Sequence, residues 1–393
     1  MHNLLAASVD RSAGLVLGEI GLVLILLGTV AFLTSKLRIS VVPFFLLSGL
    51  ILGTGGLAPL ELSDNFLSIG AQIGAILLLL LMGLEYSAKE LVTGFNKQRT
   101  LGLFDLFVNF LPGSVIALVL GWGWKGALAL GAISYVSSSG IAMQFIRESR
   151  WQRFTSTSHT INILVMEDLV LAPLLPILSA FGSGVALLTG LISISIALMV
   201  TGIAIIYSAR GGHIPYAPII LGDSATLLLV VFGAALLASG AATYIGFSGA
   251  VAAFLVGLLM TEDLAIVARV RLAPLRDLFS AIFFLFFGLR IDPSKIPSVL
   301  IPALALSIFG IGSKYLTAWW ATKNSEEAGI RLKVTGLLIP RGEFSIVIAG
   351  LTAATLFGEK IQLITITFVI LTSFVGSVLV RIASAETFKK SEY

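Results

Sequence analysis

Apolar stretches of about 20 residues recur along the whole chain, separated by short polar segments. A helix of this length crosses the hydrocarbon core of a bilayer. The pattern therefore predicts an all-α polytopic membrane protein with about 13 transmembrane helices. The expected helices cover residues 14–34, 40–53, 68–84, 101–121, 125–147, 158–181, 184–207, 217–239, 244–260, 277–290, 297–321, 333–351 and 361–382.

The composition supports this pattern. Of the 393 residues, 57% are hydrophobic and 12% are charged, whereas soluble domains carry about 25% charged residues. The net charge of +4 is too small to indicate nucleic-acid binding. The chain has no cysteine and three histidines, which excludes disulfides and thiol nucleophiles and argues against a histidine metal cluster. We expect no cofactor and no enzymatic activity.

The positions of Lys and Arg predict the topology. If the loop after the first span lies in the cytoplasm, roughly 18 basic residues lie inside and roughly 5 outside, a strong positive-inside bias. The N-terminus is therefore expected outside and the C-terminus in the cytoplasm. Lys314 and Arg341 fall within spans and need a separate explanation.

Two expected spans are interrupted near their middle, at residues 137–140 (Ser-Ser-Ser-Gly) and 340–343 (Pro-Arg-Gly-Glu). Broken helices at corresponding positions of two repeats indicate a transporter site, because they free helix ends at the membrane midplane. We expect one transporter domain over 1–393, with inverted repeats at about 14–181 and 217–382, a linker helix at 184–207 and no soluble regulatory domain. The alternative is that both breaks are kinks without function.

Two adjacent carboxylates, Glu167 and Asp168, lie inside an apolar span. An ionised acid at that depth costs about 2.5–3.5 kcal/mol on insertion scales and marks a functional site. We interpret the pair as the centre of a cation and proton site, in which Asp168 binds either a proton or a cation. Lys314 is expected to pair with Glu167; the alternative is that Lys314 extends to the cytoplasmic surface.

Further oxygen ligands for a cation are expected from hydroxyls and from carbonyls freed at the breaks. The candidate hydroxyls are Ser137, Ser138, Ser139 and Thr160.

The second break carries Arg341 and Glu343. A structural ion pair of these residues with each other or with the span 158–181 is expected, and direct ligation by Glu343 is the alternative. Asp105 and Asp223 are interpreted as interfacial residues.

Six segments follow one another in a characteristic order along the chain: 43–53, 81–85, 137–144, 246–257, 283–292 and 342–344. Each segment is weakly specific, but together they span nearly the whole chain. In this order they resemble the monovalent cation:proton antiporter-2 family of bacterial Na⁺/H⁺ and K⁺/H⁺ exchangers.

The resemblance implies a sodium/proton antiporter-like fold, a homodimer with a scaffold and an elevator-like core domain, and a bacterial plasma membrane. Asp168 matches the family's essential ion-binding acid, and Lys314 matches the lysine that pairs with it in electrogenic members. Glu167 departs from the family, which carries Asp, Asn or Gln there. The implied partners are Na⁺ or K⁺, protons and lipid, and any regulatory part would be a separate subunit.

Three other functions are alternatives to cation/proton exchange. A cation channel would need a filter loop, and no Thr-Val-Gly-Tyr-Gly-like run is present. An intramembrane aspartyl protease would use Asp223, after Gly222, together with Asp168. A sodium-coupled solute symporter would need space for an organic substrate.

Overall fold

The structure is a computed structural model of the 393-residue chain. It describes residues 11–37, 39–53, 55–58, 64–85, 88–182, 199, 202–203, 206–207, 224–244, 248–327 and 329–391. Most of the expected linker helix at 184–207 and the protease candidate Asp223 lie outside the described residues. The division into two inverted repeats therefore stays a prediction.

The described chain is built from helices. Nine are long and apolar enough to cross a membrane, or up to ten if one bent pair is a single span, and we conclude that the protein crosses the membrane several times. The helices are α2 (Arg11–Leu37), α3 (Val42–Leu52), α4 (Asp64–Glu85), α5 (Ala88–Val119), α6 (Gly123–Tyr135), α7 (Ser139–Glu148), α8 (Thr155–Gly182), α11 (Ser224–Tyr244), α12 (Gly249–Leu258), α13 (Glu262–Leu289), α14 (Leu300–Ala321), α15 (Ile330–Leu338), α16 (Glu343–Leu351) and α17 (Gly358–Ser391).

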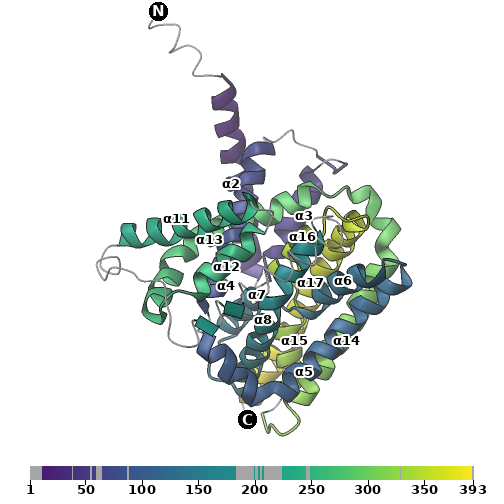
Figure 1. The fold of residues 1–393 in the computed structure, drawn as a ribbon. Coiled ribbons are helices and arrows are strands. Elements are labelled where there is room, and N and C mark those ends of the chain that lie inside the picture. The colour runs from purple at the N-terminus through teal and green to yellow at the C-terminus, as the bar shows by residue number, and fades with distance from the viewer. Residues whose placement is uncertain are drawn as a thin grey trace, which may run out of the picture.

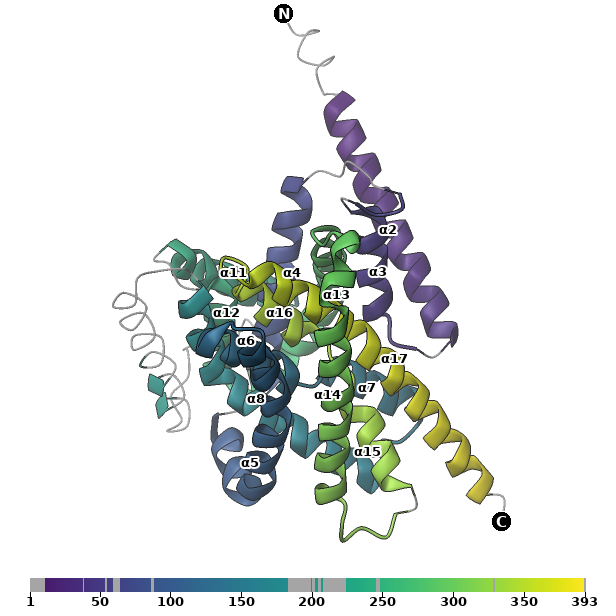
Figure 2. The ribbon, with the colours of Figure 1, turned by 90° about the vertical axis from the view of Figure 1, so that its right-hand side faces the viewer.

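The helices form two groups (Figure 1). In the first group α4 and α13 pack together, α12 and α11 cover α4, and α3 packs on α13. In the second group α5 packs on α6, α8 and α14, and α15 packs on α8 and α17. Helix α2 projects from the body in both views (Figure 2).

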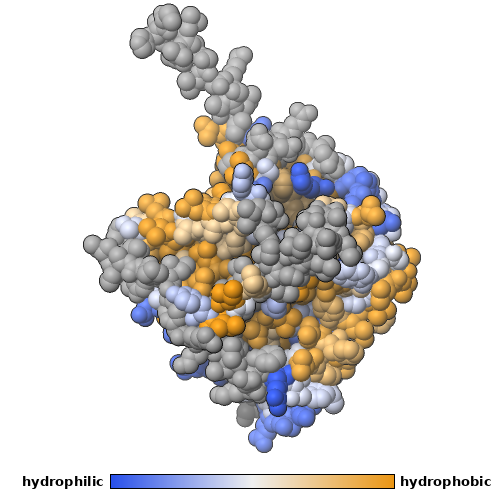
Figure 3. All heavy atoms as spheres, viewed as in Figure 1, coloured by the Kyte–Doolittle hydropathy of each residue, from blue (hydrophilic) through white to orange (hydrophobic). Residues whose placement is uncertain are grey.

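Large apolar side chains such as Ile301 and Val119 are more than four-fifths exposed, and much of the outer face is apolar (Figure 3). A lipid-facing surface requires this pattern.

Glycines allow the helices of the first group to cross closely. A Cβ atom on Gly49 of α3 would overlap the carbonyl of Leu285 on α13, and one on Gly288 would overlap the carbonyl of Leu46. Gly83 of α4 and Gly257 of α12 make the same kind of contact. Small residues at such positions let helix backbones approach in lipid. These glycines belong to the segments that carry the family resemblance, so part of that resemblance reflects helix packing.

In the part of the chain that the structure describes, the expected spans agree with the observed helices, with two clear exceptions at helix starts. The span expected at 101–121 belongs to α5, which begins at Ala88. The tenth span was expected at 277–290, but α13 begins at Glu262. Thr261 caps the start of α13 by accepting a hydrogen bond from the Leu264 N–H, 3.4 Å away. The segment 262–276 carries several basic residues, so it forms no continuous apolar run in the sequence.

Both predicted breaks are present. The first separates α6 from α7 at Val136–Ser138, and the second separates α15 from α16 at Ile339–Gly342. The two breaks meet, because the Ser138 N–H donates to the Pro340 carbonyl at 2.8 Å. Ser138 also caps α7 by accepting a hydrogen bond from the Ile141 N–H at 3.2 Å. The chain therefore brings four helix ends together inside the second group of helices.

Candidate ion-binding site

Glu167 lies beside the first break and is fully buried on α8. Its Oε2 accepts a 2.5 Å hydrogen bond from the Ser137 backbone N–H, and its Oε1 lies 3.0 Å from the Ser137 hydroxyl. A continuous helix would use that N–H for its own backbone, so the break frees the donor for the carboxylate. Hydrogen bonds from N–H and O–H groups favour the charged form of an acid. The break therefore prepares a buried position for a carboxylate.

Lys314 forms the predicted ion pair with Glu167. Its Nζ lies 2.6 Å from Glu167 Oε1, and the lysine side chain has no exposed surface. The alternative, in which Lys314 extends to the membrane surface, is wrong because α14 directs the side chain toward α5 and α8. The ring of Tyr135, at the end of α6, lies 5.5 Å from Nζ and adds a cation–π contact.

A second carboxylate, Asp105 on α5, also contacts Lys314. Its Oδ1 lies 3.2 Å from Lys314 Nζ and accepts hydrogen bonds from Asn109 and Thr317, each at 2.8 Å. Asn109 in turn accepts a hydrogen bond from the Ser313 hydroxyl at 2.8 Å. The interpretation of Asp105 as an interfacial residue is wrong, because the residue is fully buried.

The sequence contained one signal for this second acid. Asp105 and Asn109 are four residues apart on α5, and residues at that spacing share one face of a helix. Two polar side chains on one face of an apolar span require a polar partner in the neighbouring helices. The closeness of Asp105 to Arg99 in the sequence instead favoured a position for Asp105 at the membrane surface.

Asp168 follows Glu167 on α8 and is also buried, with 4% of its surface exposed. Successive residues of a helix point about 100° apart, so the two acids face different neighbours. The two adjacent buried acids, together with Lys314 at Glu167, give a site with more negative than positive charge. Such a site can take up a proton or a monovalent cation.

Arg341 and Glu343 do not form the expected ion pair. Within the described part of the chain, Arg341 makes no salt bridge, and its guanidinium donates to the carbonyls of Ser134, Leu338 and Ile339 at 2.8–3.2 Å. The side chain is fully buried, and its guanidinium lies 5.4 Å from the ring of Phe368. Arg341 thus occupies carbonyls at both breaks that were expected to be available to a cation.

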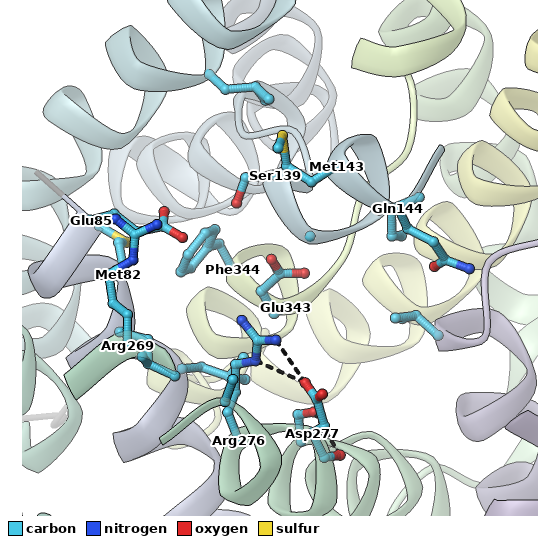
Figure 4. A pocket seen from close by; sticks show the side chains of 18 of the residues that line it. Met82, Glu85, Ser139, Met143, Gln144, Arg269, Arg276, Asp277, Glu343 and Phe344 are labelled. Atoms are coloured by element: carbon cyan, nitrogen blue, oxygen red, sulfur yellow. Dashed lines mark hydrogen bonds and ion pairs between the residues drawn. The ribbon is translucent and has the colours of Figure 1, made fainter. Parts of the chain in front are cut away.

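Glu343 points into a cavity instead. Its Oε2 accepts a 2.8 Å hydrogen bond from the Ser138 hydroxyl, and 8% of the residue is exposed. The cavity has a volume of about 770 Å³ and is lined by residues of α3, α4, α7, α8, α13 and α16 (Figure 4). Its charged lining residues are Glu85, Arg147, Arg269, Arg276, Asp277 and Glu343.

Ser137 and Ser138 connect the cavity with the buried acids. Ser138 contacts Glu343 on the cavity side, while Ser137 contacts Glu167 on the lysine side. Ser139 lines the cavity at the start of α7. Thr160 is not part of the cluster, because its hydroxyl donates to the Ser156 carbonyl and it lies about 10 Å along α8 from Glu167.

Among the described residues, no group of three or more His, Asp or Glu side chains is arranged to hold a metal ion. The oxygen donors around Glu167 and Asp168 have the chemistry that hard cations prefer.

Comparisons with known proteins identify the fold. The family described as sodium/hydrogen exchanger, transmembrane, matches residues 22–385. The chain is 24% identical over 378 residues to the K⁺/H⁺ antiporter subunit KhtU of Bacillus subtilis, covering 92% of each chain. It is 27% identical over 383 residues to the ammonium/H⁺ antiporter subunit AmhT of Alkalihalophilus pseudofirmus, again covering 92% of each. The sodium proton antiporter MjNhaP1 from Methanocaldococcus jannaschii has a similar fold, with a TM-score of 0.65 at 20% identity over 95% of this chain and 98% of that chain. The predicted sodium/proton antiporter-like fold is thereby confirmed.

Proposed function

Because this chain belongs to the sodium/hydrogen exchanger family of membrane proteins, we propose that it exchanges a monovalent cation for protons at the buried Glu167–Asp168 pair. The supporting observation is the ion pair between Glu167 and Lys314 at the first helix break. Burying a charge pair within the membrane is energetically costly, and charged residues found there usually belong to a functional site. When a cation binds the two acids, it takes the place of the Lys314 ammonium group as the positive charge next to Glu167.

Protons and cations compete for the same carboxylates in this scheme. Asp168 and Glu167 bind a cation through their oxygens, helped by the hydroxyl of Ser137. Protonation removes the negative charge that the cation needs. On either side of the membrane, the site therefore releases a cation when it takes up a proton, and releases a proton when it takes up a cation. Exchange is therefore expected to fall at low pH, where protons occupy the acids.

The cavity next to Glu343 provides the route to the site. Its basic lining residues Arg147, Arg269 and Arg276 belong to the set that the positive-inside rule places in the cytoplasm. We therefore assign the cavity to the cytoplasmic side, with the N-terminus outside and the C-terminus inside. Figure 4 shows Glu343 and Ser139 directed toward the cavity from opposite sides. A cation entering here meets Glu343 first and then the serines of the first break.

The transported cation is Na⁺ or K⁺ in this proposal, and the protein works as a transporter without enzymatic activity in a bacterial plasma membrane. The two relatives named above are described as a K⁺/H⁺ and an ammonium/H⁺ antiporter subunit. The word subunit in both names supports a separate regulatory subunit for this chain. A homodimer is part of the same proposal.

The test is cation-driven proton movement in proteoliposomes. Vesicles carrying a pH gradient and a luminal pH dye receive Na⁺, K⁺, Li⁺ or NH₄⁺, and the wild type is compared with Asp168→Asn. The wild type is expected to move protons on addition of a cation, and Asp168→Asn is expected to match empty vesicles.

Asp263→Asn is the control, because Asp263 is exposed in the first turn of α13. This variant should keep wild-type exchange. Proton movement that survives in Asp168→Asn would remove Asp168 from the site. If no cation moves protons in the wild type, a solute symporter or a channel would replace the antiporter as the proposed function.

A further inference from the structure

Lys314 has two carboxylate partners, while the exchange reaction accounts for only one. Its Nζ lies 2.6 Å from Glu167 on α8 and 3.2 Å from Asp105 on α5. All three side chains have at most 1% of their surface exposed. This second partner, Asp105, does not line the cavity. Its position calls for a separate role.

We propose that Asp105 is the alternate partner of Lys314, and that Lys314 transfers from Glu167 to Asp105 whenever a cation occupies the Glu167–Asp168 pair. This inference rests on the function proposed above. Asp105 then acts as a positioning residue, since it affects the cation through Lys314 and does not bind it. The exchange of partners sets how strongly Lys314 competes with the cation for Glu167.

The need for a second partner follows from burial. If a cation took over Glu167 and Lys314 had no other carboxylate, a buried ammonium group would remain without a countercharge, which is strongly unfavourable. Asp105 supplies that charge at the contact distance already present. The cation–π contact with Tyr135 is the other interaction that stays with Lys314 during the transfer.

The surroundings of Asp105 favour such a transfer. Its Oδ1 accepts from Asn109, Thr317 and Lys314, whereas its Oδ2 is buried and accepts no hydrogen bond from the described residues. An ammonium group has three donors, and a carboxylate oxygen accepts more than one hydrogen bond. A movement of Nζ toward Asp105 therefore gains an acceptor as it gives up Glu167. Asn109 and Thr317 hold the carboxylate in place.

Other charged groups around Asp105 do not take over its role. Glu167 on α8 shares Lys314 with Asp105 and belongs to the cation site. Tyr135 approaches from α6. Arg341, from the second break, is bound to backbone carbonyls. Lys314, from α14, is the only cation in the described residues that makes a salt bridge with Asp105.

The experiment measures the cation KM and the maximal exchange rate in proteoliposomes for the wild type and Asp105→Asn. Without the charge of Asp105, Lys314 stays on Glu167 and competes with the cation, so the cation KM is expected to rise by about tenfold, the effect of losing a close charge pair. The maximal rate at saturating cation should change much less. Asp105→Glu keeps the charge and should bring KM back toward the wild-type value.

Thr317→Val is the matched control, because it removes a hydrogen bond to the same carboxylate oxygen and keeps the charge. A purely structural role for Asp105 would move KM equally in Thr317→Val and Asp105→Asn, and that result would overturn the proposal. A wild-type KM in Asp105→Asn would overturn it as well. Either of these two results would leave the proposed function intact, provided that the wild type exchanges cations for protons.

A second variant covers the case in which Asp105→Asn does not fold. Thr317→Asp adds a carboxylate on α14 one turn from Lys314. This variant should draw Lys314 away from Glu167 and lower the cation KM below the wild-type value. An unchanged or raised KM in Thr317→Asp would contradict the transfer of Lys314 between partners.

Discussion

The two helix breaks contain similar numbers of polar groups but use them differently. At the first break, Ser137 and Ser138 direct their donors toward two carboxylates, Glu167 and Glu343. At the second break, Arg341 forms its hydrogen bonds with other groups of the protein. Arg341 binds three carbonyls, its own N–H lies 3.3 Å from the Thr372 hydroxyl, and its carbonyl accepts from Ser373 of α17 at 2.9 Å.

This difference teaches that a broken helix is not by itself an ion site. A break releases backbone donors and acceptors, and their function depends on which groups remain unsatisfied. The first break offers donors to acids that can exchange protons and cations. The second break uses a permanent cation to hold the carbonyls of both breaks in place. We therefore regard the first break as part of the ion site and the second as its support.

The largest expected effect comes from replacing Arg341 by Gln. The substitution leaves several buried carbonyls without their charged donor, and each such hydrogen bond contributes about 1.5–3 kcal/mol. The free energy of unfolding should fall by roughly 3 kcal/mol or more, seen as a lower melting temperature in detergent or a loss of folded protein. Arg381→Gln is the control, since Arg381 is exposed and donates to one carbonyl, that of Leu37. Equal melting temperatures for the two variants would refute a supporting role for Arg341.

A smaller effect, on exchange and not on folding, is expected for Ser137→Ala. The variant keeps the backbone N–H bonded to Glu167 but loses the hydroxyl that lies 3.0 Å from Oε1 and 2.8 Å from the Leu338 carbonyl. The loss of about 1 kcal/mol at the site should raise the cation KM roughly fivefold. Ser134→Ala is a matched control, because the buried Ser134 hydroxyl has no hydrogen-bond partner in the described residues. If both variants behave alike, Ser137 has no special place at the site.

The smallest effect concerns the ion pair near the start of α15, the helix that precedes the second break. Lys333, near the start of α15, lies 3.0 Å from Glu327, which also accepts a 2.9 Å hydrogen bond from the Ser156 N–H. Burial alone would raise the pKa of Glu327, but the hydrogen bonds from Lys333 and Ser156 hold it below its usual value of 4.5. An acid with a lowered pKa stabilises the fold above its usual pKa, and this contribution disappears as the pH falls through the lower value.

Glu327→Gln should therefore lower the free energy of unfolding by about 0.5–1 kcal/mol at neutral pH, and the difference from the wild type should shrink below pH 4.5. Thermal melting at several pH values measures both quantities. The neighbouring exposed residue provides the control variant Glu326→Gln, which should melt like the wild type at every pH. A constant difference between Glu327→Gln and the wild type across this pH range would show that the charge of Glu327 is not its cause.

The sequence by itself determined that the chain crosses the membrane many times, where most helices lie, where two of them break, and that Glu167 and Lys314 pair. Each of these follows from the cost of placing polar groups in an apolar solvent, which leaves a clear mark in a linear pattern. The hydrophobic pattern did not predict the start of α13, because the first half of this helix carries basic residues.

Only the tertiary structure decided the partners of the other buried polar residues. Arg341 and Glu343 are two residues apart, yet one faces backbone carbonyls and the other a cavity. Asp105 lies 209 positions from Lys314 in the chain and contacts it nonetheless. A buried polar group must find a partner, but the cost of burial does not specify which one. The packing of α5, α8 and α14 around the first break makes that choice.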